Sequence, residues 1–190
     1  MQIKLEKEFK GHNLTIRTAT ENDAKILADW WNDGRVMKFE GFPLGINTCE
    51  ETIKNQIFPI LSQDNHSFII EYDNKRIGNM GYKIKDDNSA NFLIRICELD
   101  YHERGLGTEL LKMLFNYLFY QKNVDKITCS TNLSNCRAQY VYEKKLNMKN
   151  TKILYDCWEN QVGEICSMVF YEITKEDYEK QKEDNMNKNF

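Results

Sequence analysis

Apolar and polar residues along this chain follow two periods, one typical of strands and one typical of helices. Alternating or continuous apolar runs predict strands at residues 14–17, 67–72, 76–83, 91–99 and 126–131. Apolar residues at helical spacing predict helices over residues 20–33, 49–61, 108–120 and 135–145, the first with Thr20 as its N-cap. A last hairpin is expected at residues 151–158 and 164–173. This order of elements predicts an α+β fold.

The chain is expected to form one domain over residues 1–173, because no internal repeat or low-complexity linker divides it. Residues 174–190 are dominated by Lys, Glu, Asp and Asn and form a charged C-terminal tail. That composition predicts either a solvated helix or a disordered segment.

Composition excludes several classes of function. The 190 residues are 41% hydrophobic, yet no apolar run reaches the length of about 20 residues that a membrane helix needs. A net charge of −3 argues against nucleic-acid binding, and the charged N-terminus does not resemble a signal peptide. Six cysteines show neither a Cys-x-x-Cys pair nor metal-ligand spacing, so we expect buried thiols, no metal and a cytoplasmic location.

A glycine pair stands between the strand at residues 91–99 and the helix at residues 108–120. Gly105 and Gly107 let the backbone approach a ligand, and the N–H groups of the following helix start favour an anion. The pair Thr108-Glu109 does not supply the Lys-Ser or Lys-Thr of a P-loop, and a dinucleotide fingerprint needs a third glycine. The alternative is that the two glycines only shape a tight turn.

A second motif follows the strand at residues 126–131. It reads Asn135-x-Arg137-Ala138-x-x-x-Tyr142, with Glu-Lys directly after the tyrosine. Together with the glycine pair, it resembles the two signatures of the GCN5-related N-acetyltransferase (GNAT) superfamily, in the same order. Two positions depart from the family pattern: His102 replaces Gln or Arg, and Asn147 replaces the helix-ending glycine, a position that asparagine tolerates well.

The resemblance implies a mixed, mostly antiparallel splayed sheet flanked by helices, and an N-acetyltransferase that uses acetyl-CoA. It implies that backbone N–H groups of the glycine turn hold the pyrophosphate and that Cys97 and Leu99 pair with pantetheine. Asn135 would bond the pantetheine arm, cap its own helix, or do both. The residues of the turn are Arg104, Gly105, Leu106, Gly107 and Thr108.

Acetyl transfer to an amine needs a proton acceptor, because an alkyl ammonium has a pKa of about 10.4. Glu98 and Asp100 end the strand that leads into the turn, and Glu98 is the preferred base; ordered water is the alternative. Tyr142 matches the family's tyrosine that hydrogen-bonds the coenzyme sulfur. It is also explained as a core aromatic residue of an amphipathic helix.

The acceptor is expected to bind between the first helices and the last hairpin. Acids interleaved with aromatic rings there suit a cation. The segment 31–37 resembles the RimJ/RimL-like branch, which acetylates protein N-termini; aminoglycosides or polyamines are the second choice, and a non-catalytic acyl-CoA-binding module is the third. A monomer and a homodimer both remain open. The residues that this region offers are Trp30, Trp31, Asp33, Phe39, Glu40, Phe42, Tyr155, Asp156 and Trp158.

Overall fold

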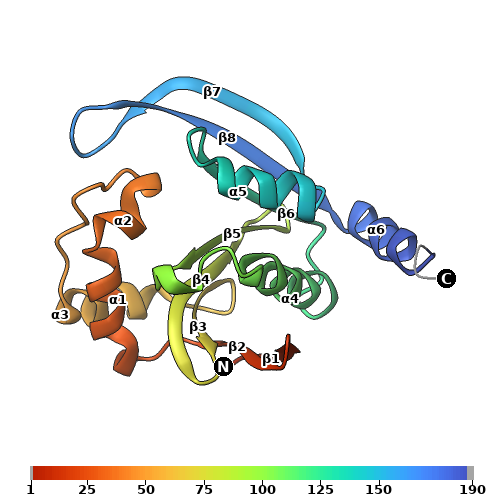
Figure 1. Cartoon of the computed structure of the whole chain (residues 1–190), viewed down its shortest axis with the longest axis horizontal. Coiled ribbons are helices and arrows are strands. Elements are labelled where there is room, and N and C mark those ends of the chain that lie inside the picture. The colour runs from red at the N-terminus through yellow and green to blue at the C-terminus, as the bar shows by residue number, and fades with distance from the viewer. Residues whose placement is uncertain (1, 188–190) are drawn as a thin grey trace.

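Eight strands form one mixed sheet in the order β1-β2-β3-β4-β5-β6-β8-β7 (Figure 1). Every neighbouring pair is antiparallel except β5 and β6, which run parallel. The predicted α+β class and the mostly antiparallel sheet are therefore confirmed. The strands are β1 (Lys4–Phe9), β2 (His12–Thr18), β3 (Asn65–Tyr72), β4 (Lys75–Ile84), β5 (Ser89–Ile96), β6 (Lys126–Asn132), β7 (Lys149–Glu159) and β8 (Ile165–Thr174).

The computed structural model describes residues 2–187, with the backbone alone at residues 56, 57 and 185–187. Short 3-10 turns lie at Glu21–Asp23, Lys38–Glu40, Phe58–Ile60 and Leu99–Tyr101, and π turns at Ile53–Ile57 and Val141–Lys145. The α-helices are α1 (Ala24–Trp31), α2 (Gly34–Met37), α3 (Glu50–Thr52), α4 (Leu106–Tyr120), α5 (Cys136–Tyr140) and α6 (Lys175–Asn187).

The sheet opens between β5 and β6. These strands pair only from Ser89 to Asn91, opposite Lys126 to Thr128. Beyond that point β5 stays paired with β4, while β6 stays paired with β8 as far as Asn132. The two halves of the sheet therefore diverge and leave a wedge between them, as the predicted splay requires.

Alternate residues of the central strands pack into two separate cores. Phe68 and Ile70 of β3 face the larger core beneath α4, whereas Ile69 faces the smaller core beneath α1. This period of two puts successive side chains on opposite faces of the sheet. Side chains of β5 therefore point alternately to the face of the sheet that α4 covers and to the face that α1 covers. The helix α2 and the loop after it lie on the second of these faces.

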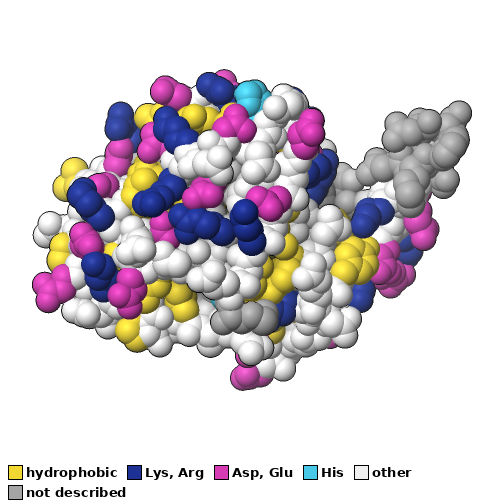
Figure 2. Space-filling model, turned by 90° about the horizontal axis from the view of Figure 1, so that it is seen from below, with side chains coloured by type: hydrophobic (Ala, Val, Ile, Leu, Met, Phe, Trp, Pro, Cys, Tyr) yellow, Lys and Arg dark blue, Asp and Glu magenta, His cyan; other side chains and the backbone are white. Residues whose placement is uncertain are grey.

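Residues 175–187 of the charged tail form α6, the solvated helix that was one of the two expectations, and residues 188–190 lie outside the described residues. Tyr178 is buried there, and its ring lies 5.1 Å from Phe119 and 6.1 Å from Phe115 of α4. One aromatic anchor thus fixes an otherwise polar helix. On the face seen in Figure 2, basic and acidic side chains are interleaved over the surface. Among the described residues, no helix has the length and apolar content to cross a membrane.

Two expected element boundaries were wrong. A charged strand, β1, precedes the predicted first strand and pairs with β2 from Lys4 to Phe9. Its side chains are mostly exposed, so it lacks the apolar run by which a strand is recognised in a sequence. Residues 49–61 do not form one helix: α3 gives way to a π turn and a 3-10 turn, because Pro59 lacks the N–H that a regular helix would need.

The helix predicted at residues 135–145 is also divided. α5 ends at Tyr140, and a π turn follows in which the N–H of Leu146 donates to Val141 O at 3.0 Å. Asn147 then takes the left-handed conformation, with φ 48°, as predicted for a helix end. Single π turns are frequent at functional sites, and this one contains Tyr142.

Candidate active site

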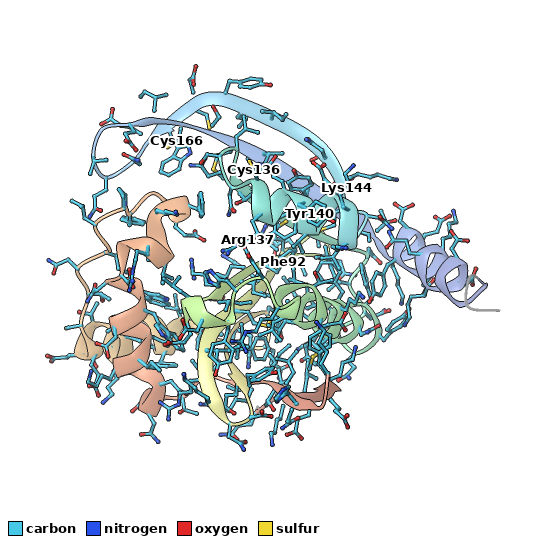
Figure 3. All side chains as sticks on the ribbon, in the orientation of Figure 1. Phe92, Cys136, Arg137, Tyr140, Lys144 and Cys166 are labelled. Atoms are coloured by element: carbon cyan, nitrogen blue, oxygen red, sulfur yellow. The ribbon has the colours of Figure 1, made fainter. Side chains whose placement is uncertain are left out.

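The wedge between β5 and β6 forms a cleft of about 1300 Å³. Residues 91–96 of β5 line one side, and residues 130–132 of β6 and the start of α5 line the other. The glycine turn lines one part of the cleft, and the 3-10 turn after α2 lines another. Figure 3 shows Phe92 of β5 and Arg137 of α5 in the gap between the two halves of the molecule. The cleft is larger than most small-molecule sites, which range from about 300 to 1000 Å³.

The glycine turn presents free backbone donors to this cleft. Gly105 has φ 84°, a conformation that glycine adopts without strain, and it precedes the first residue of α4. The first bond into the helix runs from Glu109 N–H to Gly105 O at 3.4 Å. Within the described residues, the N–H groups of Leu106, Gly107 and Thr108 therefore have no backbone acceptor. Such a helix start binds anions well, so the residues present fit a pyrophosphate.

His102 connects the turn to both walls of the cleft. Its Nε2 lies 2.8 Å from the carbonyl oxygen of Ile96, and its Nδ1 lies 2.9 Å from Nη1 of Arg137. Because guanidinium only donates, Nδ1 accepts and Nε2 carries the hydrogen. The His102 ring thus joins the end of β5 to the Arg137 guanidinium of α5.

Asn135 caps α5. Its side-chain oxygen accepts from Ala138 N–H at 3.3 Å, and its amide donates to Thr131 Oγ1 at 3.0 Å. Both bonds fix the start of α5 against the end of β6. The capping role expected of Asn135 is therefore present, and its residue also lines the cleft.

Tyr142 lies at the base of the wedge. Its ring contacts Phe92 edge-on at 5.7 Å and Tyr171 at 5.5 Å, and the residue is 7% exposed. Burial raises the pKa of Tyr142 well above its ordinary value, and the negative charge of Glu40 adds to this rise. The phenol is therefore neutral at pH 7 and remains a hydrogen-bond donor. No hydrogen bond to its hydroxyl is made within the described residues.

Glu40 and Arg95 form an ion pair at the other end of the cleft. Nη2 of Arg95 lies 3.2 Å from Oε1 of Glu40, and both residues line the cleft. The side chain of Arg95 is 14% exposed, and that of Glu40 is 45% exposed. The turn that contains Glu40 packs against β6, the strand on the other side of the wedge from β5. Glu40 is therefore the acidic residue of the lining at this end of the cleft.

The tip of the β7–β8 hairpin, residues 158–164, closes this end of the cleft. The N–H of Gln161 donates to Gly41 O, and its side-chain amide bonds Leu44 N–H and Gly45 O at 3.0 and 2.9 Å. The ring of Trp158 lies against Gly41, where a Cβ would come within 2.2 Å of it. In Figure 1 the hairpin arches from α5 to α2. The hairpin tip and the loop at residues 41–45, which are far apart in sequence, thus form one wall of the cleft.

Ten of the predicted site residues line the cleft: Phe39, Glu40, Leu99, Gly105, Leu106, Gly107, Thr108, Asn135, Tyr142 and Trp158. They include the glycine turn and the tyrosine, which the structure brings into one cavity. The hairpin residue Trp158 joins them from the opposite end of the chain. The two signature motifs are therefore adjacent in space.

Three residues expected near the coenzyme lie elsewhere. Cys97 is buried on the α1 side and its N–H donates to Ile77 O, so that group is not free to pair with a ligand. Glu98 accepts from Trp30 Nε1 at 3.0 Å and is outside the cleft lining. Arg104 is exposed, with its guanidinium 5.0 Å from the Tyr101 ring. Their positions follow from the alternation of β5 and the bend after it.

Six residues expected around the acceptor are also outside the lining, and Phe42 and Asp156 are two of them. Trp30 is buried in the smaller core and holds Glu98, and Trp31 packs against that core. Asp33 caps α2 and pairs with Arg35 at 2.6 Å. Tyr155 is 69% exposed, on a bulge of β7 that interrupts its pairing with β8.

Arg95 is the cleft residue that the sequence analysis missed. A single arginine between Ile94 and Ile96 resembles an ordinary solvent-facing position of an alternating strand. The sequence offered one signal that could have identified it: Arg95 stands two residues before Cys97, on the strand that leads to the glycine turn. Its pairing with Glu40 depends on a loop 55 residues earlier, which periodicity does not reveal.

Comparison with known proteins agrees with this geometry. Residues 13–145 match the family described as Acetyltransferase (GNAT) domain. The fold is similar to a spermidine N-acetyltransferase from Vibrio cholerae in complex with CoA and spermine, with a TM-score of 0.77 and 20% identity over 87% of this chain and 97% of that one. It is also similar to a GNAT-family acetyltransferase from Bacillus anthracis, with a TM-score of 0.73 and 20% identity over 92% and 99% of the two chains.

Replacement of Gly107 tests the anion site. Gly107→Asp adds a carboxylate beside the free N–H groups, where it repels a phosphate, so acetyl-CoA affinity should fall by about 100-fold or more. The fold has room for the side chain, because a Cβ at Gly107 meets only Ile96 Cδ1 at 3.9 Å. Isothermal titration calorimetry measures the affinity.

Gly107→Ala is the matched control, since it adds bulk without charge. We expect less than about a tenfold loss of affinity from it and an unchanged melting temperature for both variants. Wild-type affinity in Gly107→Asp would contradict the assignment of this turn to the pyrophosphate.

Proposed function

This chain belongs to the GNAT acetyltransferase domain family, and from that premise we propose that it transfers the acetyl group of acetyl-CoA to a primary amine that enters the cleft beneath the β7–β8 hairpin. The observation that carries the proposal is that one cavity contains the glycine turn, Tyr142 and the Glu40–Arg95 pair. The family supports an N-acetyltransferase, and its members use acetyl-CoA.

The coenzyme half of the cleft suits a long, diphosphate-containing thioester. The free N–H groups of Leu106, Gly107 and Thr108 would hold the pyrophosphate. Arg137 lies opposite this turn and adds a positive charge to the same end. The edge of β5 beyond Asn91 lacks a neighbour on the β6 side, so the amides of pantetheine would pair with it as a strand does.

The amine must lose a proton before it attacks the thioester carbonyl. Glu40 is placed better for this role than Glu98, because its carboxylate faces the cleft and interacts with Tyr142. Glu98 is outside the lining and is bonded to Trp30. We therefore assign proton acceptance to Glu40, directly or through water. The new C–N bond then forms as the C–S bond breaks.

Tyr142 stabilises the sulfur that leaves. A phenol whose pKa is raised stays protonated, so it can donate a hydrogen bond to the developing thiolate, which takes its proton from solvent. Packing between Phe92 and Tyr171 holds the ring in place. The hydroxyl has no competing partner within the described residues, which supports this role.

The chemical class of the amine acceptor is proposed from the sequence and from the structural neighbours. The segment 31–37 supports the RimJ/RimL-like branch and, with it, a peptide N-terminus as acceptor. The spermidine N-acetyltransferase neighbour supports acetylation of a small amine.

Thiol release from acetyl-CoA tests the proposed activity. Purified protein is mixed with N-terminal peptides, amino acids, aminosugars and polyamines, and free thiol is measured with a chromogenic disulfide. We expect acceptor-dependent release with at least one class of primary amine, and mass spectrometry should show a single added acetyl group. Release that does not depend on any amine would contradict the proposal.

Tyr142→Phe should lower kcat by about 10- to 100-fold, because one hydrogen bond to a charged sulfur is lost. The KM for acetyl-CoA should change little, since the hydroxyl acts on the leaving group. The ring remains, so its contacts with Phe92 and Tyr171 and the melting temperature should be retained. An unchanged kcat would remove Tyr142 from the mechanism.

Glu40→Gln should lower kcat/KM at neutral pH by about 100-fold or more, as expected when a general base is removed. The deficit should shrink as pH rises, because the free amine becomes abundant without a base. Glu98→Gln is the matched comparison and should cost much less. A larger loss from Glu98→Gln would return the role of base to Glu98.

A further inference from the structure

Two buried N–H donors in the lining of the cleft have no acceptor among the described residues. One is Nε of Arg95, and the other is Nε1 of Trp158. A buried donor without a partner is costly, so proteins rarely leave one unless water or a ligand completes it. A third such donor, Nε1 of Trp31, lies outside the lining. Two such donors at one end of a cleft indicate that an oxygen-rich group binds there.

The two donors belong to the same end of the cleft because both residues contact neighbouring positions of one loop. Arg95 pairs with Glu40, and the ring of Trp158 lies against Gly41. Arg95 reaches this point from β5, and Trp158 reaches it from the tip of the β7–β8 hairpin. Along β5, Arg95 alternates with Ile94 and Ile96, which pack against the core beneath α4, so its side chain points to the other face of the sheet from the glycine turn.

The charges at this end favour an anionic group. Arg35, Lys38 and Arg95 line it, and two of them are paired, Arg35 with Asp33 at 2.6 Å and Arg95 with Glu40 at 3.2 Å. The second acidic residue of the lining, Glu103, follows His102 in the glycine turn. Among the described residues, Lys38 is thus the lining cation of this end without a carboxylate partner, and the free charge that remains there is positive.

We infer that the acceptor is an amine that also carries a carboxylate a few bonds from its nitrogen, as an amino acid does. This inference rests on the proposed acetyl transfer and specifies its substrate. The carboxylate binds the free Nε edge of Arg95 and the indole N–H of Trp158. Arginine is suited to this role because its planar fork matches a carboxylate.

The short distance between Glu40 and Arg95 explains why the amine and the carboxylate of the acceptor must lie close together. Its oxygen is 3.2 Å from the Arg95 guanidinium, so one short zwitterion can contact both residues. The carboxylate then turns the nitrogen towards Glu40, which is electrostatically coupled to Tyr142. Arg95 thus sets specificity, and Glu40 receives the amine for reaction.

The test compares acceptors that differ only in the anionic group. Thiol release from acetyl-CoA is measured with α-amino acids and β-alanine, with the carboxamide of each, and with spermidine. We expect kcat/KM for the best acid to exceed that for its amide by about 100-fold, because the amide leaves charged donors unmatched. The amine of an amino amide is less basic than that of the acid, so intrinsic reactivity opposes the expected preference.

Two variants test the residues. Arg95→Gln should reduce the ratio of acid to amide to near one by raising the KM for the acid. Trp158→Phe keeps an aromatic ring against Gly41 but removes the N–H, and it should reduce the ratio by about tenfold. Arg76→Gln is the control: it removes an arginine from the neighbouring strand β4, outside the cleft lining, and should preserve the ratio.

Equal turnover of acids and amides by the wild-type protein would overturn the inference while leaving acetyl transfer intact. More efficient turnover of spermidine than of any acid would do the same. A preference for acids that survives in Arg95→Gln would remove Arg95 from recognition and overturn this assignment. Absence of release with every amine would instead overturn the proposed function and this inference with it.

Discussion

The separation of β5 from β6 is the constraint on which the site depends. Three residue pairs join these strands, and the ring of Tyr142 then lies at the base of the gap, between Phe92 of β5 and Tyr171 of β8. The backbone of β5 beyond Asn91 is left with polar groups facing a cavity rather than a strand. Buried backbone groups need partners, so the gap is stable only if water or a strand-like ligand supplies them. The same separation that creates the cavity therefore creates its affinity for an extended, amide-containing molecule.

Local signals predicted the coenzyme half of the cleft from sequence. A glycine in the left-handed conformation before a helix, an asparagine N-cap and a hairpin turn each depend on a few neighbouring residues, and Gly105 and Asn135 both have the expected conformation or contact. The acceptor half depends on contacts between distant segments. The pairing of Arg95 with Glu40 and the seating of Trp158 on Gly41 exist only once the hairpin and the loop meet. The error at β1 has the same origin, because this strand lacks an apolar pattern and is defined by its pairing with β2. The error at residues 49–61 is different, because its cause, Pro59, is local.

Similarity of fold does not determine the charge of the acceptor site. The spermidine N-acetyltransferase from Vibrio cholerae and this chain superimpose well at 20% identity, a level at which the backbone is shared and most side chains differ. The sequence pattern of acids among aromatic residues suggested a cationic acceptor, and the structure adds Arg35, Lys38 and Arg95 to that end of the cleft. Two of these cations are paired, Arg35 with Asp33 and Arg95 with Glu40, so they and the acids of the pattern largely offset one another. The composition of a segment therefore does not fix the charge of a site, because ion pairs within the fold decide which charges remain free.

The hairpin tip can change in sequence without changing the residues that are proposed to carry out the chemistry. Gln161 bonds three backbone groups of residues 41–45, and backbone contacts tolerate changes in the side chains around them. Substitutions at Trp158 or along the loop can therefore alter the acceptor end while the glycine turn and Tyr142 remain in place. Gly41 is the exception, because any side chain there would strike the Trp158 ring and its φ of 94° strains other residues. A larger residue at Gly41 would displace the hairpin from the loop, and the acceptor end would lose its wall and its indole donor together.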